Sequence, residues 1–174
     1  HTRLQGDWSS DVCSSDLHEQ LNDITAYLSR VAAPERREVQ APQVQHGEAL
    51  FAAVGCAVCH RPQWQTGVAA HDPALAGRSF APYTDLLVHD MGAGLADGRP
   101  DYLANGREWR TPPLWGIGLI ERVNGHTRYL HDGRARNLDE AVRWHDGEGR
   151  AARLRFERLA PADRAALLAF LGSL

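Results

Sequence analysis

Two cysteines and a histidine stand close together in the segment CAVCH, residues 56–60. Two thiols separated by two residues can reach the two vinyl groups of one porphyrin, and the imidazole that follows directly is then held under the iron. The C-x-x-C-H spacing therefore predicts covalent attachment of one haem c through Cys56 and Cys59. In this interpretation His60 is the proximal ligand of the iron.

Other uses of a closely spaced cysteine pair remain open. A structural zinc site typically takes four ligands from two separated pairs, and the chain has no second pair. A thioredoxin-like dithiol would begin a helix after a buried strand, whereas the sequences around this motif read as helix and loop. A plain disulfide fits the spacing but leaves the long loops that follow it unexplained.

A haem iron has a second axial position, which raises the question of what faces His60. The candidates are Met91, the only methionine, and the histidines at positions 46, 71, 89, 126, 131 and 145. A His/Met pair raises the haem potential, two histidines generally lower it, and an empty sixth site would admit peroxide. We interpret His89 and His131, each followed by an aspartate, as hydrogen-bonded structural residues.

The segment RNLDEAVRWHDGE favours His145 as the sixth ligand. Asn137 can cap a helix whose third residue is Glu140, as in an approximate capping box. Leu138, Val142 and His145 are then spaced by four and three residues, so they share the buried face of that helix. The alternative is a hydrogen-bonded histidine at the helix end, beside an aspartate.

Three further stretches position these residues. In residues 21–31 apolar side chains recur at spacings of three and four, which predicts a helix that ends before Pro34, followed by an exposed linker. A second helix is expected over residues 46–55, just before the cysteines. The clearest helix begins at Pro161 and continues to the C-terminus. Its apolar face consists of Leu167, Phe170, Leu171 and Leu174.

Residues 61–118 are rich in Gly and Pro and contain the stiff stretch WRTPPLWGIG. Strand-like alternation is scarce there, and loops of this length in a compact domain are usually functional. The pattern predicts a mainly α domain whose long loops wrap around a bound group.

Composition excludes several classes of function. The net charge is −3, and all 19 cationic residues are arginines. No run of them is dense enough to indicate a nucleic-acid surface. No apolar stretch reaches the roughly 18 residues of a membrane span.

The first residues differ from the rest of the chain. Back-translation of GDWSSDVCSSDL, residues 6–17, gives a sequence that resembles a common short-read sequencing adaptor. This stretch has neither apolar periodicity nor the layout of a signal peptide. We therefore treat residues 1–17, with Cys13, as an artefact and exclude them from the fold prediction.

Four motifs occur in the order CAVCH, YTDLLVHDMG, WRTPPLWGIG and YLHDGRARNLDEAVRWHDGE. Together they resemble the C-terminal haem domain of the bacterial di-haem cytochrome c peroxidase superfamily. The similarity is greatest to the di-haem oxidoreductase branch, often labelled "putative thiol oxidoreductase", and covers residues 44–174. It implies a class I cytochrome c-like haem domain, mainly α, with long Gly/Pro-rich loops, in which the helix near residues 46–55 packs against the C-terminal helix.

The resemblance also implies roles for single residues. His145 occupies the position where the peroxidases carry a methionine as sixth ligand, a departure that argues against a high-potential His/Met haem. Arg110 matches a stretch that passes close to the cofactor in relatives, so it is expected to pair with a haem propionate or else to be a solvated loop arginine. Trp109, Trp115 and Trp144 are expected to line an electron route or to pack against porphyrin or core.

Members of this superfamily carry two haems in two cytochrome-like domains, whereas this chain has a single C-x-x-C-H motif. By resemblance, residues 18–43 are the terminal helix of an upstream haem domain that is lost from this sequence, followed by a linker. The haem domain itself is residues 44–174. An internal similarity agrees with this division, because ITAYLS, residues 24–29, has the same pattern as LLAFLG, residues 167–172.

The predicted function is covalent haem binding and electron transfer, as the C-terminal part of a truncated di-haem oxidoreductase of peroxidase type. The full-length protein would be the enzyme, and this fragment would only transfer electrons, with a small redox protein as the expected donor. Thioether attachment occurs outside the cytoplasm, which predicts a periplasmic location. The alternatives are a monohaem electron carrier with no enzymatic activity and a metal-binding or dithiol module without haem.

Overall fold

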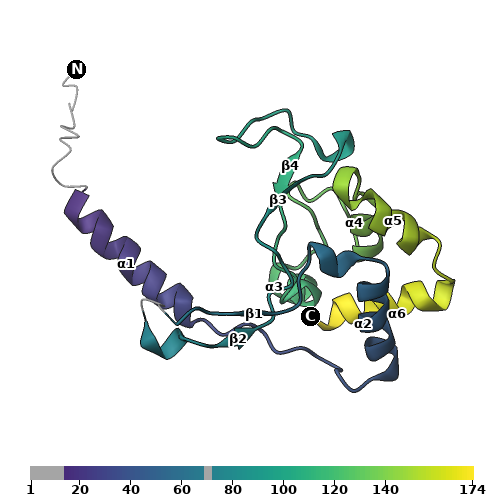
Figure 1. The fold of residues 1–174 in the computed structure, drawn as a ribbon, viewed down its shortest axis with the longest axis horizontal. Helices are drawn as coiled ribbons and strands as arrows, with labels where there is room; N and C mark the ends of the chain where they lie inside the picture. Colours follow the sequence, from purple (N-terminus) through teal and green to yellow (C-terminus); the bar gives the residue numbers. More distant parts are fainter. Residues whose placement is uncertain (1–13, 69–71) are drawn as a thin grey trace. The chain divides into compact units, whose positions relative to one another are not determined.

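The structure is a computed structural model that describes residues 14–68 and 72–174. The chain divides into two units, His1–Ala33 and Pro34–Leu174, and each is described by itself. Of the first unit, the helix α1, Ser14–Arg30, is the described element (Figure 1). The prediction of a helix over residues 21–31 is confirmed, although the helix also extends to Ser14, inside the segment that we interpret as adaptor.

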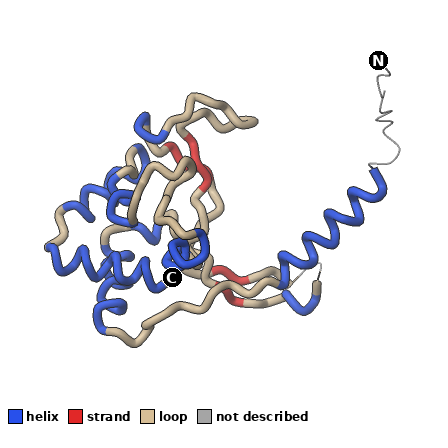
Figure 2. Tube along the Cα trace, turned by 180° about the vertical axis from the view of Figure 1, so that it is seen from behind, coloured by secondary structure: helices blue, strands red, loops and turns tan. Residues whose placement is uncertain are grey.

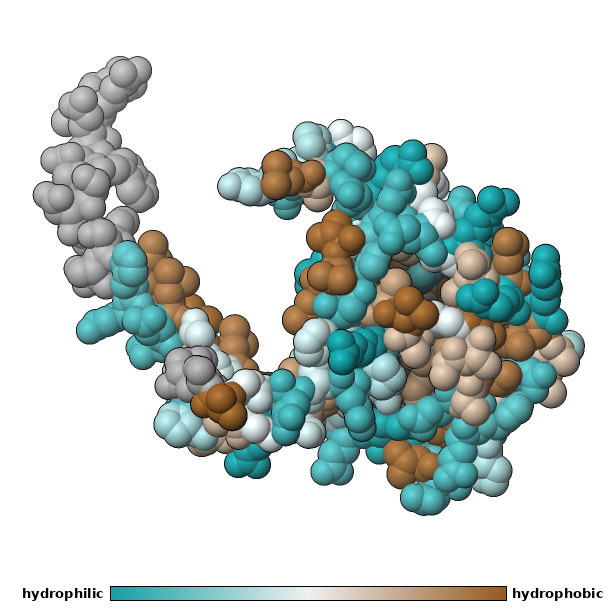
Figure 3. Space-filling view, viewed as in Figure 1, coloured by the Kyte–Doolittle hydropathy of each residue, from teal (hydrophilic) through white to brown (hydrophobic). Residues whose placement is uncertain are grey.

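The apolar side chains of α1 are exposed. They form a stripe along the helix on the face shown in Figure 3. The interpretation of residues 1–17 as adaptor stays a prediction, because residues 1–13, including Cys13, lie outside the described part of the chain.

Helices make up most of the regular secondary structure of the second unit, in agreement with the predicted mainly α class. Its described helices are α2 (Pro42–Ala53), α3 (Ile120–Asn124), α4 (Leu138–Arg143), α5 (Arg150–Glu157) and α6 (Pro161–Ser173). Both α2 and α6 begin with proline, whose fixed φ suits the first helical turn and whose missing N–H needs no partner there. The last helix begins at Pro161 as predicted, whereas the second helix, expected over residues 46–55, begins earlier, at Pro42.

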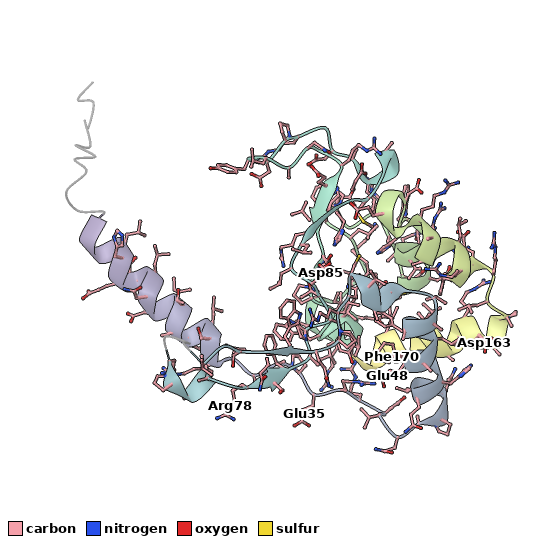
Figure 4. All side chains as sticks on the ribbon, viewed as in Figure 1. Glu35, Glu48, Arg78, Asp85, Asp163 and Phe170 are labelled. Atoms are coloured by element: carbon pink, nitrogen blue, oxygen red, sulfur yellow. The ribbon has the colours of Figure 1, made fainter. Side chains whose placement is uncertain are left out.

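The core lies where α2 crosses α6. A Cβ at Gly47 of α2 would overlap the backbone carbonyl of Ala166, so only glycine allows the two helices to approach this closely. Phe51 then packs on Phe170, with ring centroids 5.2 Å apart. Figure 4 labels Phe170 beside Glu48 at this crossing. The predicted contact between the second and the last helix is confirmed.

Two small antiparallel sheets lie between α2 and α3 in the sequence (Figure 2). In one of them β1 (Trp64–Gln65) pairs with β2 (Ser79–Phe80), and in the other β3 (Val88–Asp90) pairs with β4 (Glu108–Arg110). Sequence periodicity did not reveal these strands, because two or three residues are too few to show an alternating pattern. The stretch predicted to be loop therefore contains short ordered pairings.

The linker expected after Pro34 is not free. Arg36 makes a bidentate ion pair with Glu48 of α2, at 2.9 Å for both nitrogens. The backbone N–H of Arg37 donates to the carbonyl of Ser173 at 2.8 Å. The prediction that this linker is exposed was thus partly wrong, because these arginines bind the segment to α2 and α6. Within the described residues, no helix combines the length and apolar character that crossing a membrane requires.

Candidate functional site

The C-x-x-C-H motif follows α2 through a turn that needs glycine. Gly55 has a φ of 92°, and a Cβ there would lie 2.6 Å from the guanidinium of Arg155. The motif then winds into a short 3-10 turn, Cys56–Val58, which ends at Cys59. Both cysteines are free thiols, and burial raises the pKa of Cys56 to about 11. A reactive dithiol needs a lowered thiol pKa, so this environment disfavours the thioredoxin-like alternative.

His60 is oriented by a backbone carbonyl. Its Nδ1–H donates to the carbonyl oxygen of Tyr83 at 3.0 Å. Tyr83 adopts the left-handed region with a φ of 55° and is almost fully buried. A residue with this side chain adopts such a φ only when its surroundings hold it there.

The surroundings that hold Tyr83 come from its neighbour Thr84. The Thr84 hydroxyl, fully buried, donates to the carbonyl of Thr111 at 2.6 Å and accepts from the N–H of Leu86 at 2.9 Å. The Thr84 carbonyl accepts from the indole N–H of Trp64 at 2.6 Å. These bonds fix the peptide that presents its carbonyl to His60.

His145 stands directly after α4. Asn137 caps this helix as predicted, because its side chain accepts from the N–H of Glu140 at 2.8 Å. The reciprocal bond of a capping box is shifted by one residue, since the Glu140 carboxylate accepts from the N–H of Arg136. His145 donates its Nδ1–H to the carbonyl of Ala141 at 2.8 Å, which turns the ring back along the helix.

The two histidines are chemically alike. Burial lowers the pKa of His60 to about 4, and burial also lowers the pKa of His145. Both imidazoles are therefore neutral at pH 7. Because each Nδ1 carries the proton that it donates to a carbonyl, each Nε2 keeps a free lone pair, which is the state of a metal-ligating histidine.

The rings of His60 and His145 lie next to each other, with centroids 6.4 Å apart and planes inclined by 53°. A metal–imidazole bond is about 2 Å long, so two imidazoles on opposite sides of one metal ion have centroids about 6 Å apart. The observed spacing fits this arrangement. The donor set thus suits an iron held by two histidines, next to two thiols at haem-attachment spacing.

The family model for "di-haem oxidoreductase, putative peroxidase" matches residues 7–174. The chain belongs to this family. The match includes residues 18–174, which we attribute to the protein, and also residues 7–17 of the segment that we interpret as adaptor. No curated protein and no solved structure matches the chain.

The other histidines considered as sixth ligand in this di-haem oxidoreductase family member have other neighbours. His46 pairs with Asp163 at 2.7 Å on the exposed side of α2, and His126 accepts from a backbone N–H in an exposed loop. His131 stacks on Trp109, with centroids 3.6 Å apart. His71 lies outside the described residues.

Met91 lies on the His145 side of the site. A Cβ built on Gly149 would be 3.3 Å from the methyl group of Met91 and 3.4 Å from the imidazole of His145. Gly149 therefore leaves space that both side chains use. The geometry brings Met91 close to His145, while His145 is the residue whose ring faces His60.

A cluster that the sequence did not predict lies beside Cys59. His89 Nε2 is 2.7 Å from Asp85 Oδ2, and His89 Nδ1 is 2.8 Å from Glu148 Oε2. The bond to Glu148 raises the pKa of His89, against the effect of its burial, and the bond to Asp85 adds to this. The sequence indicated a structural role for His89, but its partner Glu148 is 59 residues away, so no local pattern could reveal it.

The ligand atoms of Cys59, Asp85 and His89 lie within 4.8 Å of one another. This spacing would suit a metal ion. Each nitrogen of His89, however, lies at hydrogen-bonding distance from a carboxylate oxygen, an arrangement that suits an imidazolium donating a hydrogen bond to each. The cluster is better described as a hydrogen-bonded bridge than as the alternative zinc site.

Arg110 and three tryptophans are the remaining residues to which the sequence analysis assigns a role. Arg110 is exposed on β4, opposite Val88, and its guanidinium has no ion-pair partner among the described residues. Its role toward a haem propionate stays a prediction. Trp109 donates its indole N–H to a carbonyl in the neighbouring loop at 3.0 Å, Trp115 packs near Phe80, and Trp144 packs under a guanidinium.

Proposed function

We propose that residues 34–174 bind one haem c covalently and transfer electrons through it, within the oxidoreductase chemistry of the family. Cys56 and Cys59 would hold the porphyrin, and His60 and His145 would hold the iron. One observation carries this proposal: two neutral imidazoles, each with Nδ1 bound to a carbonyl and Nε2 free, stand at the spacing of a shared metal ion.

When bound, a haem with two histidine ligands supplies reversible one-electron transfer, generally at a low potential. The chain contributes by keeping both ligands neutral through burial and by orienting each ring through a backbone carbonyl. These bonds also raise the basicity of the ligating nitrogen. Arg110 would balance a propionate charge; its exposed guanidinium, without an ion-pair partner among the described residues, supports this role.

If His60 and His145 both hold the iron, these two residues would leave no position on it for peroxide. We therefore assign electron transfer, and not peroxide reduction, to the haem of this unit. The 174 residues contain one C-x-x-C-H motif, so a second haem would need a motif outside this sequence. We further propose a cytochrome c-like fold for this unit, a periplasmic location, since thioethers form outside the cytoplasm, and a small redox protein as electron donor.

The test uses absorption and low-temperature EPR spectra of the chain expressed with haem maturation, together with His145→Ala. The expected result is a low-spin spectrum that becomes high-spin in the variant. His126→Ala is the matched control, because this histidine is exposed and belongs to another surface loop. Absence of a Soret band would reject haem binding, and a spectrum unchanged in His145→Ala would remove His145 from the iron and point to Met91 or an open site.

A further inference from the structure

We propose that His89 is a positioning residue that ties the segment supporting His60 to the segment carrying His145, and thereby keeps the sixth ligand on the iron. The inference rests on the haem ligation proposed above. It concerns a residue, His89, that the proposed ligation does not use. Three observations support it: bonds on the His60 side, bonds on the His145 side, and close backbone packing between the two.

On the His60 side, Asp85 belongs to the same short segment as Tyr83, whose carbonyl orients His60. One carboxylate oxygen of Asp85 accepts from the backbone N–H of Leu87 at 3.0 Å. The other faces His89 Nε2 at 2.7 Å, and the Asp85 side chain is only 12% exposed. Asp85, labelled in Figure 4, is therefore held by a backbone N–H of its own segment.

On the His145 side, Glu148 follows the ligand by three residues. One of its carboxylate oxygens faces His89 Nδ1 at 2.8 Å, and the other accepts from the backbone N–H of Asp90 at 3.0 Å. Glu148 thus forms hydrogen bonds to two groups of β3, the His89 side chain and the backbone N–H of Asp90. Both hydrogen bonds between Glu148 and β3 therefore pass through one carboxylate.

The backbone of residues 90–92 packs against the backbone of residues 146–147, with no space for a side chain at Gly92 or Gly147. A Cβ at Gly147 would overlap the carbonyl of Asp90, and a Cβ at Gly92 would lie 2.9 Å from Cβ of Asp146. Both glycines also have positive φ values. This packing means that a shift of β3 relative to residues 146–149 moves the backbone next to His145.

His89 is suited to the bridge because an imidazolium can donate from both nitrogens in opposite directions. A neutral ring would place a lone pair against one of the two carboxylates. The positive charge is shared between Asp85 and Glu148, and the side chain of His89 is 15% exposed, so water competes weakly for these bonds.

The consequence concerns how often the sixth ligand leaves the iron. An external anion can bind a haem of this kind only after its sixth ligand dissociates. Removal of a hydrogen bond to a charged group should raise the population of the dissociated state, and with it the cyanide binding rate, about tenfold or more. His60 and the thioethers hold the haem in either case, so its absorption spectrum remains measurable.

The experiment measures the rate at which potassium cyanide binds to the oxidised, haem-loaded chain. The variants are His89→Ala, Glu148→Gln and the double variant, with His46→Ala as the control, because His46 forms a similar pair with Asp163 far from the bridge. We expect each bridge variant to bind cyanide faster, the double variant to equal the faster single variant, and His46→Ala to match the wild type. His89→Arg, which keeps a charged double donor, should restore part of the slow rate.

An unchanged cyanide rate in His89→Ala, or effects that multiply in the double variant, would overturn the bridge while leaving the haem proposal intact. If the wild type lacks a low-spin haem spectrum, the proposed ligation fails and the bridge fails with it. If His89→Ala does not fold, Glu148→Gln decides, because the Glu148 side chain is 57% exposed and its substitution leaves the buried groups in place.

Discussion

Thr84 tests how the fold orients His60, the proposed proximal ligand. Substitution Thr84→Val keeps the shape of this fully buried side chain but removes the hydroxyl that bonds to Thr111 and Leu86. The Thr111 carbonyl is buried and would lose this partner, and the Leu86 N–H is partly buried. Leaving a buried polar group unsatisfied costs about 1–3 kcal/mol, so we expect a loss of about 2–4 kcal/mol in unfolding free energy.

Urea denaturation of the haem-loaded chain measures this loss. Thr84→Ser is the matched control, because it keeps the hydroxyl and removes one methyl group, which is worth about 1 kcal/mol. The haem potential should also change in Thr84→Val and not in Thr84→Ser, since the neighbouring carbonyl of Tyr83 accepts from His60. A Thr84→Val variant as stable as Thr84→Ser, with an unchanged potential, would refute this reasoning.

Two further predictions concern packing and charge. Gly47→Ala should destabilise the unit by about 1–3 kcal/mol, because its Cβ would overlap a carbonyl of α6, whereas Gly172→Ala has open space and should be neutral or stabilising in thermal denaturation. Gly47→Ala with an unchanged Tm would show that α2 and α6 can separate without cost. The pKa of His89 is raised, so its contribution to stability is complete below its unfolded pKa of about 6.5 and is lost as pH rises through the folded value. Burial raises the pKa of Asp85, but its hydrogen bonds outweigh this and lower it, and the bond to His89 lowers the pKa of Glu148, so their contributions are lost as pH falls. The stability difference between wild type and His89→Gln should therefore be largest at pH values above the pKa values of the two carboxyl groups and below the pKa of His89. Urea titrations at a series of pH values measure this difference. A difference independent of pH would contradict the charged bridge.

The helices were predictable because their signals are local. An apolar face at spacings of three and four, a proline at the first turn and the Asn137 cap all depend on residues within a few positions of one another. The second helix begins at Pro42, earlier than expected, since the weak apolar pattern there did not mark its start. The strands could not be predicted, because their pairing depends on distant segments.

The site was predictable in part for the same reason. The motif of Cys56, Cys59 and His60 is local, and His145 followed from a helical face and a family resemblance. The contacts that orient and support these residues were missed. Tyr83 carries no sequence signal for its left-handed backbone, and Glu148 read as one more charged residue near a helix end.

By itself, the sequence determined the local features of this protein: two thiols and an imidazole at C-x-x-C-H spacing, a capped helix followed by a histidine, and helices whose apolar faces require burial. Only the tertiary structure decided that the ring centroids of His60 and His145 lie 6.4 Å apart and that both rings keep Nε2 free. The physical reason is the distance along the sequence over which each interaction acts. Spacing and capping act between near neighbours, whereas the distance between residues 85 positions apart depends on how α2, α4 and α6 pack, and on close backbone contacts that glycines permit.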